Sequence, residues 1–333
     1  MSNFAKNKIR LVPLAAGVLI FLVLLFSLGP MAVFTTIARA KPGYLFLTTG
    51  FFILPNLLRI YKWRIMQNRI GSSAGFSLIT SIYFSSKFWG MVSPMRSGEV
   101  VPALLGSKGN SMRGKLLSII LFDRVIETAQ SLMVFFMFFL LFYKVFFNAS
   151  AGTALAGITV ILLVFSFLLF SKASGEKILG ITGSVLSNLG ENRLTALLKG
   201  KLGKLKELLD EFYAATGSYF RLGFTLYVLV LTFVCWGFDM LFWLMLFKAF
   251  AVDISLWFVL ASVTVYSVMA ALAPIPGGLG AAELPFVLIL KKIGYIGEAG
   301  GIIIAARVLS TGYLALAYAL SNRLRQPSEA SID

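Results

Sequence analysis

The sequence predicts an all-α, polytopic integral membrane protein with about seven to nine transmembrane helices. Its 333 residues are 58% hydrophobic and only 13% charged, about half the charged fraction of an ordinary globular protein. So few charges do not cover a water-exposed surface, which excludes a soluble enzyme and a nucleic-acid-binding protein. The net charge of +16 is explained by loops, because membrane proteins concentrate Lys and Arg in cytoplasmic loops and beside anionic lipid.

The sequence is poor in the residues that hold metals and perform acid–base chemistry. It has no histidine and a single cysteine, Cys235. These counts exclude a disulfide framework, a Cys/His metal site and a catalytic triad with a histidine base. We therefore expect neither a metal nor a cofactor.

The first predicted element is the apolar run at residues 11–28, which follows three basic residues and precedes Ala38-Arg39-Ala40. A basic start, an apolar run and an A-x-A motif are also the signature of a secretory signal peptide. The run is longer than the usual ~7–15 residues of a signal peptide, and the motif lies well beyond its end. We expect an uncleaved first transmembrane helix.

Further apolar runs are long enough to cross about 30 Å of hydrocarbon. They comprise residues 44–58, 125–147, 152–171, 224–250, 256–273 and 301–320. Basic residues precede the first span, follow the second (Arg59, Lys62, Arg64 and Arg69) and recur through residues 172–221. Under the positive-inside bias these regions are cytoplasmic. We expect a multi-pass protein of the cell (plasma or inner) membrane with a cytoplasmic N-terminus.

The predicted cytoplasmic loop at residues 172–221 contains one amphipathic helix. Apolar residues recur at three- and four-residue steps, the period of a helix face: Leu198, Leu202, Leu205, Leu208, Leu209 and Phe212. Lysines flank this stripe, so we expect the helix to lie on anionic lipid headgroups, or alternatively to bind a soluble enzyme partner. Residues 1–322 are predicted to form a single transmembrane domain, followed by a short polar tail at 323–333.

Two apolar segments are interrupted by glycine and proline. Residues 76–105 contain Pro94, Gly98 and Pro102, and residues 273–290 contain Pro274, Pro276, Gly277, Gly278 and Gly280. Non-helical backbone at membrane depth is tolerated only where protein or a water-filled cavity satisfies its polar groups. We expect two broken, re-entrant segments, which in transporters are the best sequence pointer to the binding site.

The two broken segments share a pattern that predicts an internal repeat. Each has a glutamate just after the break, Glu99 or Glu283, and a proline two or three residues further on. The same spacing separates Pro102 from Arg124 and Pro285 from Arg307. Many transporters are built from such repeats, with the substrate at the interface between them.

Charged side chains within apolar runs are costly, about 2.5–3.5 kcal/mol for an Asp, Lys or Arg at the centre of a span. Two interpretations stay open for them. In the first, they form structural ion pairs: Arg96 with Glu99, Arg124 with Asp123 or Glu127, and Arg307 with Glu283. Alternatively they line a polar cavity whose arginines bind a phosphate. The substrate-binding set is then Arg96, Glu99, Arg124, Glu283 and Arg307, and the set for ion, proton or headgroup coupling is Asp123, Glu127 and Asp239.

At these residues the chain resembles the transmembrane region of lysylphosphatidylglycerol synthases, also called the flippase-like domain family. The specific element is Pro274-x-Pro276-Gly277-Gly278-Leu279-Gly280-x-x-Glu283 with Arg307 downstream. The looser element is Ser93-Pro94-x-Arg96-x-Gly98-Glu99 with Asp123-Arg124 downstream. The resemblance covers roughly residues 10–322.

The resemblance implies a domain that moves a lipid, such as an aminoacylated phosphatidylglycerol, between membrane leaflets. The full-length synthases carry a soluble carboxy-terminal domain for aminoacyl transfer, which is not seen in this sequence, so we expect a transporter and not an enzyme. Two alternatives stay open. One is a membrane-embedded transferase acting on a lipid or isoprenoid carrier, and the other is a non-transporting membrane partner subunit. The lipid and the oligomeric state are not predicted.

Overall fold

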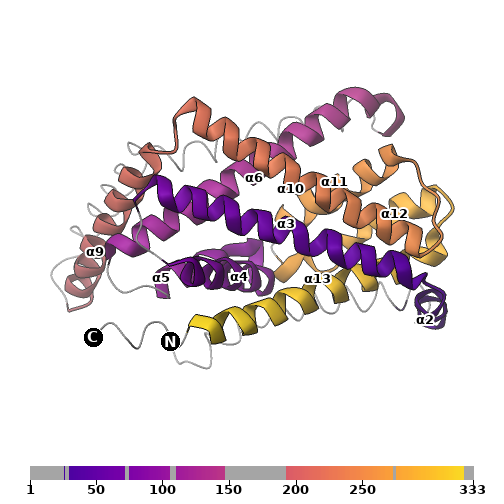
Figure 1. The fold of residues 1–333 in the computed structure, drawn as a ribbon, viewed down its shortest axis with the longest axis horizontal. Coiled ribbons are helices and arrows are strands. Elements are labelled where there is room, and N and C mark those ends of the chain that lie inside the picture. The colour runs from indigo at the N-terminus through magenta and orange to yellow at the C-terminus, as the bar shows by residue number, and fades with distance from the viewer. Residues whose placement is uncertain are drawn as a thin grey trace. The chain divides into compact units, whose positions relative to one another are not determined.

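The computed structural model of the protein describes residues 30–71, 75–105, 110–146, 193–272 and 275–325, together with Phe26. All regular structure in these ranges is helical, as predicted (Figure 1). The helices are α2 (Pro30–Ala38), α3 (Pro42–Arg69), α4 (Phe76–Val92), η1 (Pro94–Val100), α5 (Val101–Leu105), α6 (Asn110–Phe146), α9 (Arg193–Gly217), α10 (Leu222–Ala249), α11 (Leu256–Leu272), η2 (Pro276–Gly278), α12 (Glu283–Lys292) and α13 (Ile296–Arg325).

Three of the described helices are long and apolar enough to cross a membrane, namely Pro42–Arg69, Leu222–Ala249 and Ile296–Arg323. They contain the predicted runs at 44–58, 224–250 (apart from its last residue) and 301–320. The predicted run at 152–171 lies outside the described residues, as do residues 172–192 of the predicted loop. The predicted run at 11–28 also lies outside them, apart from Phe26. A total of seven to nine spans therefore stays a prediction.

Helix α3 extends beyond the predicted apolar run at residues 44–58 and includes the four basic residues that follow this run, Arg59, Lys62, Arg64 and Arg69. It continues without interruption from Pro42 to Arg69. The helix accommodates Arg59 and Lys62 because each pairs with a carboxylate of another helix, Asp239 and Asp123 respectively. Neither side chain then presents an unpaired charge to lipid.

Contacts divide the chain into two compact units. The first contains residues up to Tyr61, residues Gly75–Val101 and residues from Leu231 onwards. Its core lies where α10, α11, α12 and α13 meet, with Phe247, Phe286 and Ile302 fully buried. Helix α13 also packs along α4, and the two lie side by side in Figure 1. This unit holds η1 and η2, the short helices of the two broken segments.

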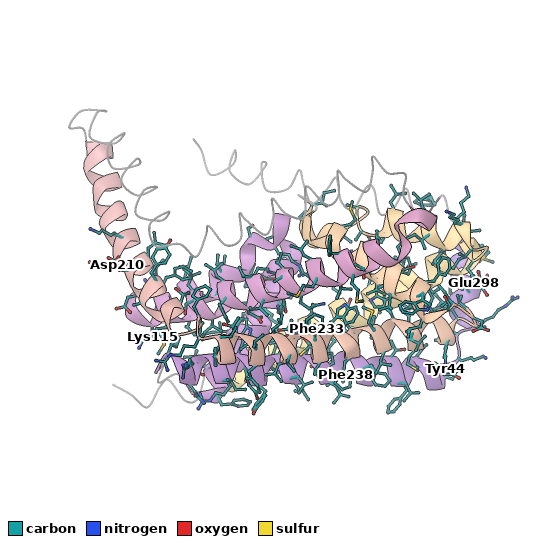
Figure 2. The ribbon with its side chains drawn as sticks, turned by 90° about the horizontal axis from the view of Figure 1, so that it is seen from above. Tyr44, Lys115, Asp210, Phe233, Phe238 and Glu298 are labelled. Atoms are coloured by element: carbon teal, nitrogen blue, oxygen red, sulfur yellow. The ribbon has the colours of Figure 1, made fainter. Side chains whose placement is uncertain are left out.

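The second unit contains Lys62–Ala74 and Pro102–Val230. Its main contact joins α9 to α6, near the N-terminal turns of α6 where Lys115 lies (Figure 2). A Cβ at Gly114 would meet the Cβ of Glu211 at 2.5 Å and the carbonyl oxygen of Leu208 at 3.2 Å. The predicted amphipathic helix is therefore present in α9, and its buried Phe212 faces α6.

Candidate functional site

The first broken segment forms the short helix η1 directly after α4. Ser93 is extended (φ −113°, ψ 149°) and Pro94 begins the turn, since a proline needs no N–H donor there. The hydroxyl oxygen of Ser93 accepts a 2.6 Å hydrogen bond from the Gly98 N–H. A Cβ at Gly98 would collide with the carbonyl oxygen of Trp89, so this glycine allows η1 to fold back on α4. Pro102 is the second residue of α5, which begins at Val101, and it does not break a helix.

Helix η1 carries one exposed and one buried charged residue. Arg96 is exposed and has a φ of 56°, a left-handed conformation that is strained in residues other than glycine and is typical of functional sites. Glu99 is buried. Its side chain lies on α4, because a Cβ at Gly90 would meet Glu99 Oε1 at 2.8 Å.

The second broken segment forms η2 with similar local geometry. Ile275 is extended and Pro276 begins the turn. Gly277 and Gly278 then have φ values of 60° and 65°, which glycine adopts without steric cost. A Cβ at Gly277 would lie 2.9 Å from the Met91 carbonyl oxygen, and one at Gly278 would lie 2.7 Å from Ala270 Cα. These glycines bring η2 close to the backbones of α4 and α11.

An ion pair fixes the end of the second segment. Glu283, the first residue of α12, is fully buried and accepts hydrogen bonds from the Gly280 N–H at 2.7 Å and from Arg307 Nε at 2.6 Å. Arg307 Nη2 also contacts Glu283 Oε1. The predicted Arg307–Glu283 pair is confirmed, and it links η2, α12 and α13.

Helices η1 and η2 contact each other. We define the η1–η2 junction by Arg96, Glu99, Gly277, Glu283 and Arg307, all in the first unit. Four of the five predicted substrate-binding residues belong to it, and Arg124 lies in the other unit. The structure adds Tyr266 of α11, whose ring centroid lies 5.7 Å from the Arg307 guanidinium carbon. Sequence reasoning missed Tyr266, because a tyrosine within an apolar run has no distinguishing pattern.

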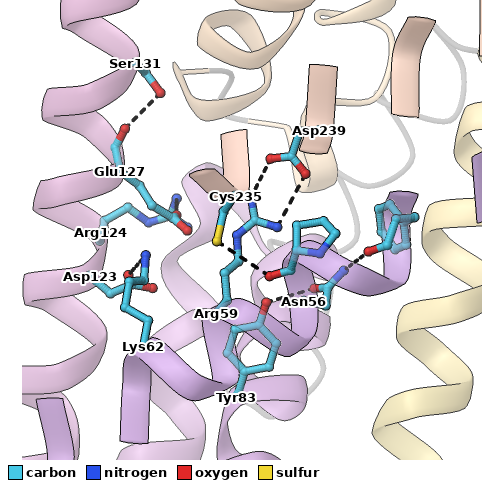
Figure 3. Close-up of polar contacts among 12 residues, drawn as sticks. Asn56, Arg59, Lys62, Tyr83, Asp123, Arg124, Glu127, Ser131, Cys235 and Asp239 are labelled. Atoms are coloured by element: carbon cyan, nitrogen blue, oxygen red, sulfur yellow. Dashed lines mark hydrogen bonds and ion pairs between the residues drawn. The ribbon is translucent and has the colours of Figure 1, made fainter. Parts of the chain in front are cut away.

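Asp239, a predicted coupling residue, belongs to the first unit and pairs with Arg59 (Figure 3). Its carboxylate lies 2.5 Å from Arg59 Nη2, and the two side chains are 30% and 18% exposed respectively. The partner comes from another helix, since α10 has no basic residue near Asp239. One turn from Asp239, the Cys235 thiol lies 3.8 Å from the Pro55 carbonyl oxygen.

The other predicted coupling residues, Asp123 and Glu127, lie on α6 in the second unit (Figure 3). Asp123 is buried and contacts Lys62 Nζ at 2.6 Å, and its other oxygen accepts a 2.7 Å hydrogen bond from Trp63 Nε1. Its predicted partner Arg124 instead contacts Glu127 at 3.4 Å, the second of the two pairings expected for that arginine.

The comparison with protein families agrees with the two broken segments. A family model described as the lysylphosphatidylglycerol synthase TM region matches residues 14–318. The chain belongs to this family. The match spans both units and includes every residue of the η1–η2 junction. No curated protein matches the chain.

Membership of the lysylphosphatidylglycerol synthase TM region family and the long apolar helices identify a helical membrane protein with a lipid-related function. Within this chain, the two broken segments meet at the η1–η2 junction. It combines an exposed arginine, a fixed arginine and irregular backbone beside α4 and α11.

Proposed function

We propose that the protein is a lipid transporter that moves a lipid with a polar headgroup, such as an aminoacylated phosphatidylglycerol, between membrane leaflets. The headgroup binds at the η1–η2 junction while the acyl chains stay in the bilayer. The observation that carries the proposal is the contact between η1 and η2, which gathers Arg96, Glu283 and Arg307 from three parts of the sequence.

The backbone of the junction supports this assignment. Irregular backbone within apolar segments needs protein or water to satisfy its polar groups, and here a side chain satisfies some of them. Glu283 accepts the Gly280 N–H, and Ser93 accepts the Gly98 N–H. Broken helices of this kind hold the substrate at the centre of many transporters. We further propose that the two segments are the matching parts of an internal repeat.

The orientation and the lipid contacts are part of the same proposal. We place the protein in the cell membrane with its N-terminus in the cytoplasm, and α9 beside anionic lipid. Lys206 of α9 is exposed, while Phe212 of the same helix is buried. The charged side of α9 is therefore available for headgroups, which attract basic residues by about 1 kcal/mol each.

A leaflet-resolved transport assay tests the proposal. Purified protein in proteoliposomes should move fluorescently labelled phosphatidylglycerol or its aminoacylated form faster than protein-free vesicles do. Glu283→Gln should abolish this movement, because Arg307 loses its charged partner. Glu298→Gln, which changes a carboxylate of α13 that lies outside the junction, is the matched control and should transport like the wild type.

Two results would contradict the proposal. The first is that vesicles containing the protein move none of the candidate lipids faster than empty vesicles do, although a cooperative thermal transition confirms that the protein is folded. The other is covalent modification of a lipid by the purified protein when it is supplied with an activated donor, which would favour the transferase alternative.

A further inference from the structure

Tyr266 lies at the η1–η2 junction with its ring in a fixed position. The ring centroid is 5.1 Å from that of Trp243 and 6.0 Å from that of Phe286, both in edge-on geometry. The Arg307 guanidinium carbon lies 5.7 Å from the same centroid. Aromatic and cation–π contacts of this kind orient a ring, so the direction of the Tyr266 hydroxyl is set by its neighbours.

The Tyr266 hydroxyl differs from those of Tyr83 and Tyr295 in its hydrogen bonding. Tyr83 and Tyr295 donate hydrogen bonds to Asn56 and to the Asp253 carbonyl oxygen. No hydrogen bond of the Tyr266 hydroxyl occurs within the described part of the chain. Helix α11, which carries Tyr266, contacts both η1 and η2, and the residue is partly exposed.

Both carboxylates of the junction are buried. Glu283 has no exposed surface and already accepts hydrogen bonds from Gly280 and Arg307. Glu99 is buried against Gly90 of α4. Arg96 is exposed and Tyr266 is partly exposed, and both side chains can donate hydrogen bonds. A set of donors beside an arginine selects an anion, and arginine suits a phosphate in particular.

We propose that Tyr266 donates a hydrogen bond to the phosphate of the lipid headgroup, which Arg96 binds by charge. Glu283 and Arg307 are then positioning residues that fix η2 and the Tyr266 ring. This inference rests on the proposed function, because it names the chemical class that the junction binds. According to this proposal, the site recognises the phosphate of the headgroup and not its cationic part.

The test compares Tyr266→Phe with the matched variant Tyr313→Phe. Both keep the aromatic ring and remove one hydroxyl, and Tyr313 lies on α13, where its ring packs edge-on against Phe52 and Phe84. Binding is measured in nanodiscs of a neutral, phosphate-free glycolipid to which phosphatidylglycerol is added in steps. Tyr266→Phe should bind phosphatidylglycerol about tenfold more weakly, as expected for one lost hydrogen bond to a charged group. Tyr313→Phe should bind like the wild type.

A second arm separates the lipid from its phosphate. Inorganic phosphate is added to the nanodiscs as a competitor, with sodium chloride at equal ionic strength as the reference. Displacement of the lipid from the wild type, and weaker displacement from Tyr266→Phe, would show that the phosphate group itself is recognised. Absence of displacement together with weaker lipid binding by Tyr266→Phe would show that the site takes phosphate only as part of a lipid.

Wild-type affinity in Tyr266→Phe, with an unchanged melting temperature, would overturn the inference. The proposed function would survive that result if Glu283→Gln still abolished transport. Conversely, hydroxyl-dependent binding without movement of lipid between leaflets would contradict the proposed function and leave the phosphate site in place.

Discussion

Arg59 Nη2 lies 2.5 Å from Asp239 Oδ2, and this ion pair joins α3 to α10 across 180 residues of sequence. Both helices are long and apolar enough to cross a membrane. Charged groups on spanning helices are costly unless they are paired. The pair therefore explains how each helix tolerates its charge, and it connects the two helices within the first unit.

Replacing either partner should destabilise the first unit. Asp239→Asn or Arg59→Gln leaves the other charge without its partner, and we expect a loss of about 1–2 kcal/mol, since the pair is only partly buried. The double variant should recover part of this loss, because neither charge then remains. Melting temperatures of the wild type, the two single variants and the double variant in detergent give the interaction energy between the two residues. Strictly additive losses would show that the two residues do not interact.

The Lys62–Asp123–Trp63 cluster should stabilise the second unit and take no part in transport. Asp123→Asn strands a lysine with no exposed surface, so we expect a loss of about 3–5 kcal/mol. Trp63→Phe removes one hydrogen bond and should cost less, about 1–2 kcal/mol. Lys62→Met combined with Asp123→Leu should restore stability and transport, measured by melting temperature and the proteoliposome assay. A stable double variant that transports no lipid would instead assign Asp123 to coupling.

Gly277→Ala should disturb the junction. The residue has a φ of 60°, and an added Cβ would lie 2.9 Å from the Met91 carbonyl oxygen. Left-handed backbone costs about 1–2 kcal/mol in a residue with a Cβ, and the close contact adds to this. We expect a lower melting temperature and impaired lipid transport. Gly312→Ala on α13, where a Cβ meets nothing within 4 Å, is the control and should be neutral or stabilising.

The positions of the long helices and of the broken segments could be predicted from sequence. The expected run at 224–250 corresponds to α10, and that at 256–273 to α11. The breaks at Pro94 and Pro276 become η1 and η2. These features have local causes, because twenty apolar residues favour a spanning helix and a Gly/Pro cluster interrupts it.

The end of α3 and the partners of its charges could not be predicted. The sequence places Arg59 and Lys62 after the second apolar run and does not show that α3 continues through them, because their carboxylate partners, Asp239 and Asp123, are remote in sequence. Tyr266 was missed for the same reason. Its ring contacts Trp243, Phe286 and Arg307 through tertiary packing, which no local pattern encodes.

The contact between α6 and α9 should depend on Gly114. An alanine there would place its Cβ 2.5 Å from the Cβ of Glu211, with backbone of α9 immediately beyond. Gly114→Ala should therefore loosen α9, which hydrogen exchange of residues 206–217 would report as faster exchange. Gly217→Ala on α9, whose Cβ would meet nothing within 4 Å, should leave this exchange unchanged. Equal protection in both variants would contradict the close contact.

The pH dependence of stability offers a test at Tyr219, which lies between α9 and α10. The side chain is fully buried, stacks on Phe122 and donates a 3.4 Å hydrogen bond to the Met66 carbonyl oxygen. Burial raises the pKa of Tyr219 well above its ordinary value, and the hydrogen bond with Ser118 only partly opposes this. The folded protein therefore binds the phenolic proton more tightly than the unfolded chain does.

The resulting stabilisation is fully present below the unfolded pKa of about 10 and is lost as pH rises above it, by up to about 1.4 kcal/mol per pH unit. Melting temperatures of the wild type should thus fall more steeply between pH 10 and 11 than those of Tyr219→Phe, which has no proton to lose. Tyr61→Phe, at a tyrosine that is 52% exposed, should follow the wild type. Parallel curves for wild type and Tyr219→Phe would show that Tyr219 ionises equally in both states, which is incompatible with its burial against Phe122.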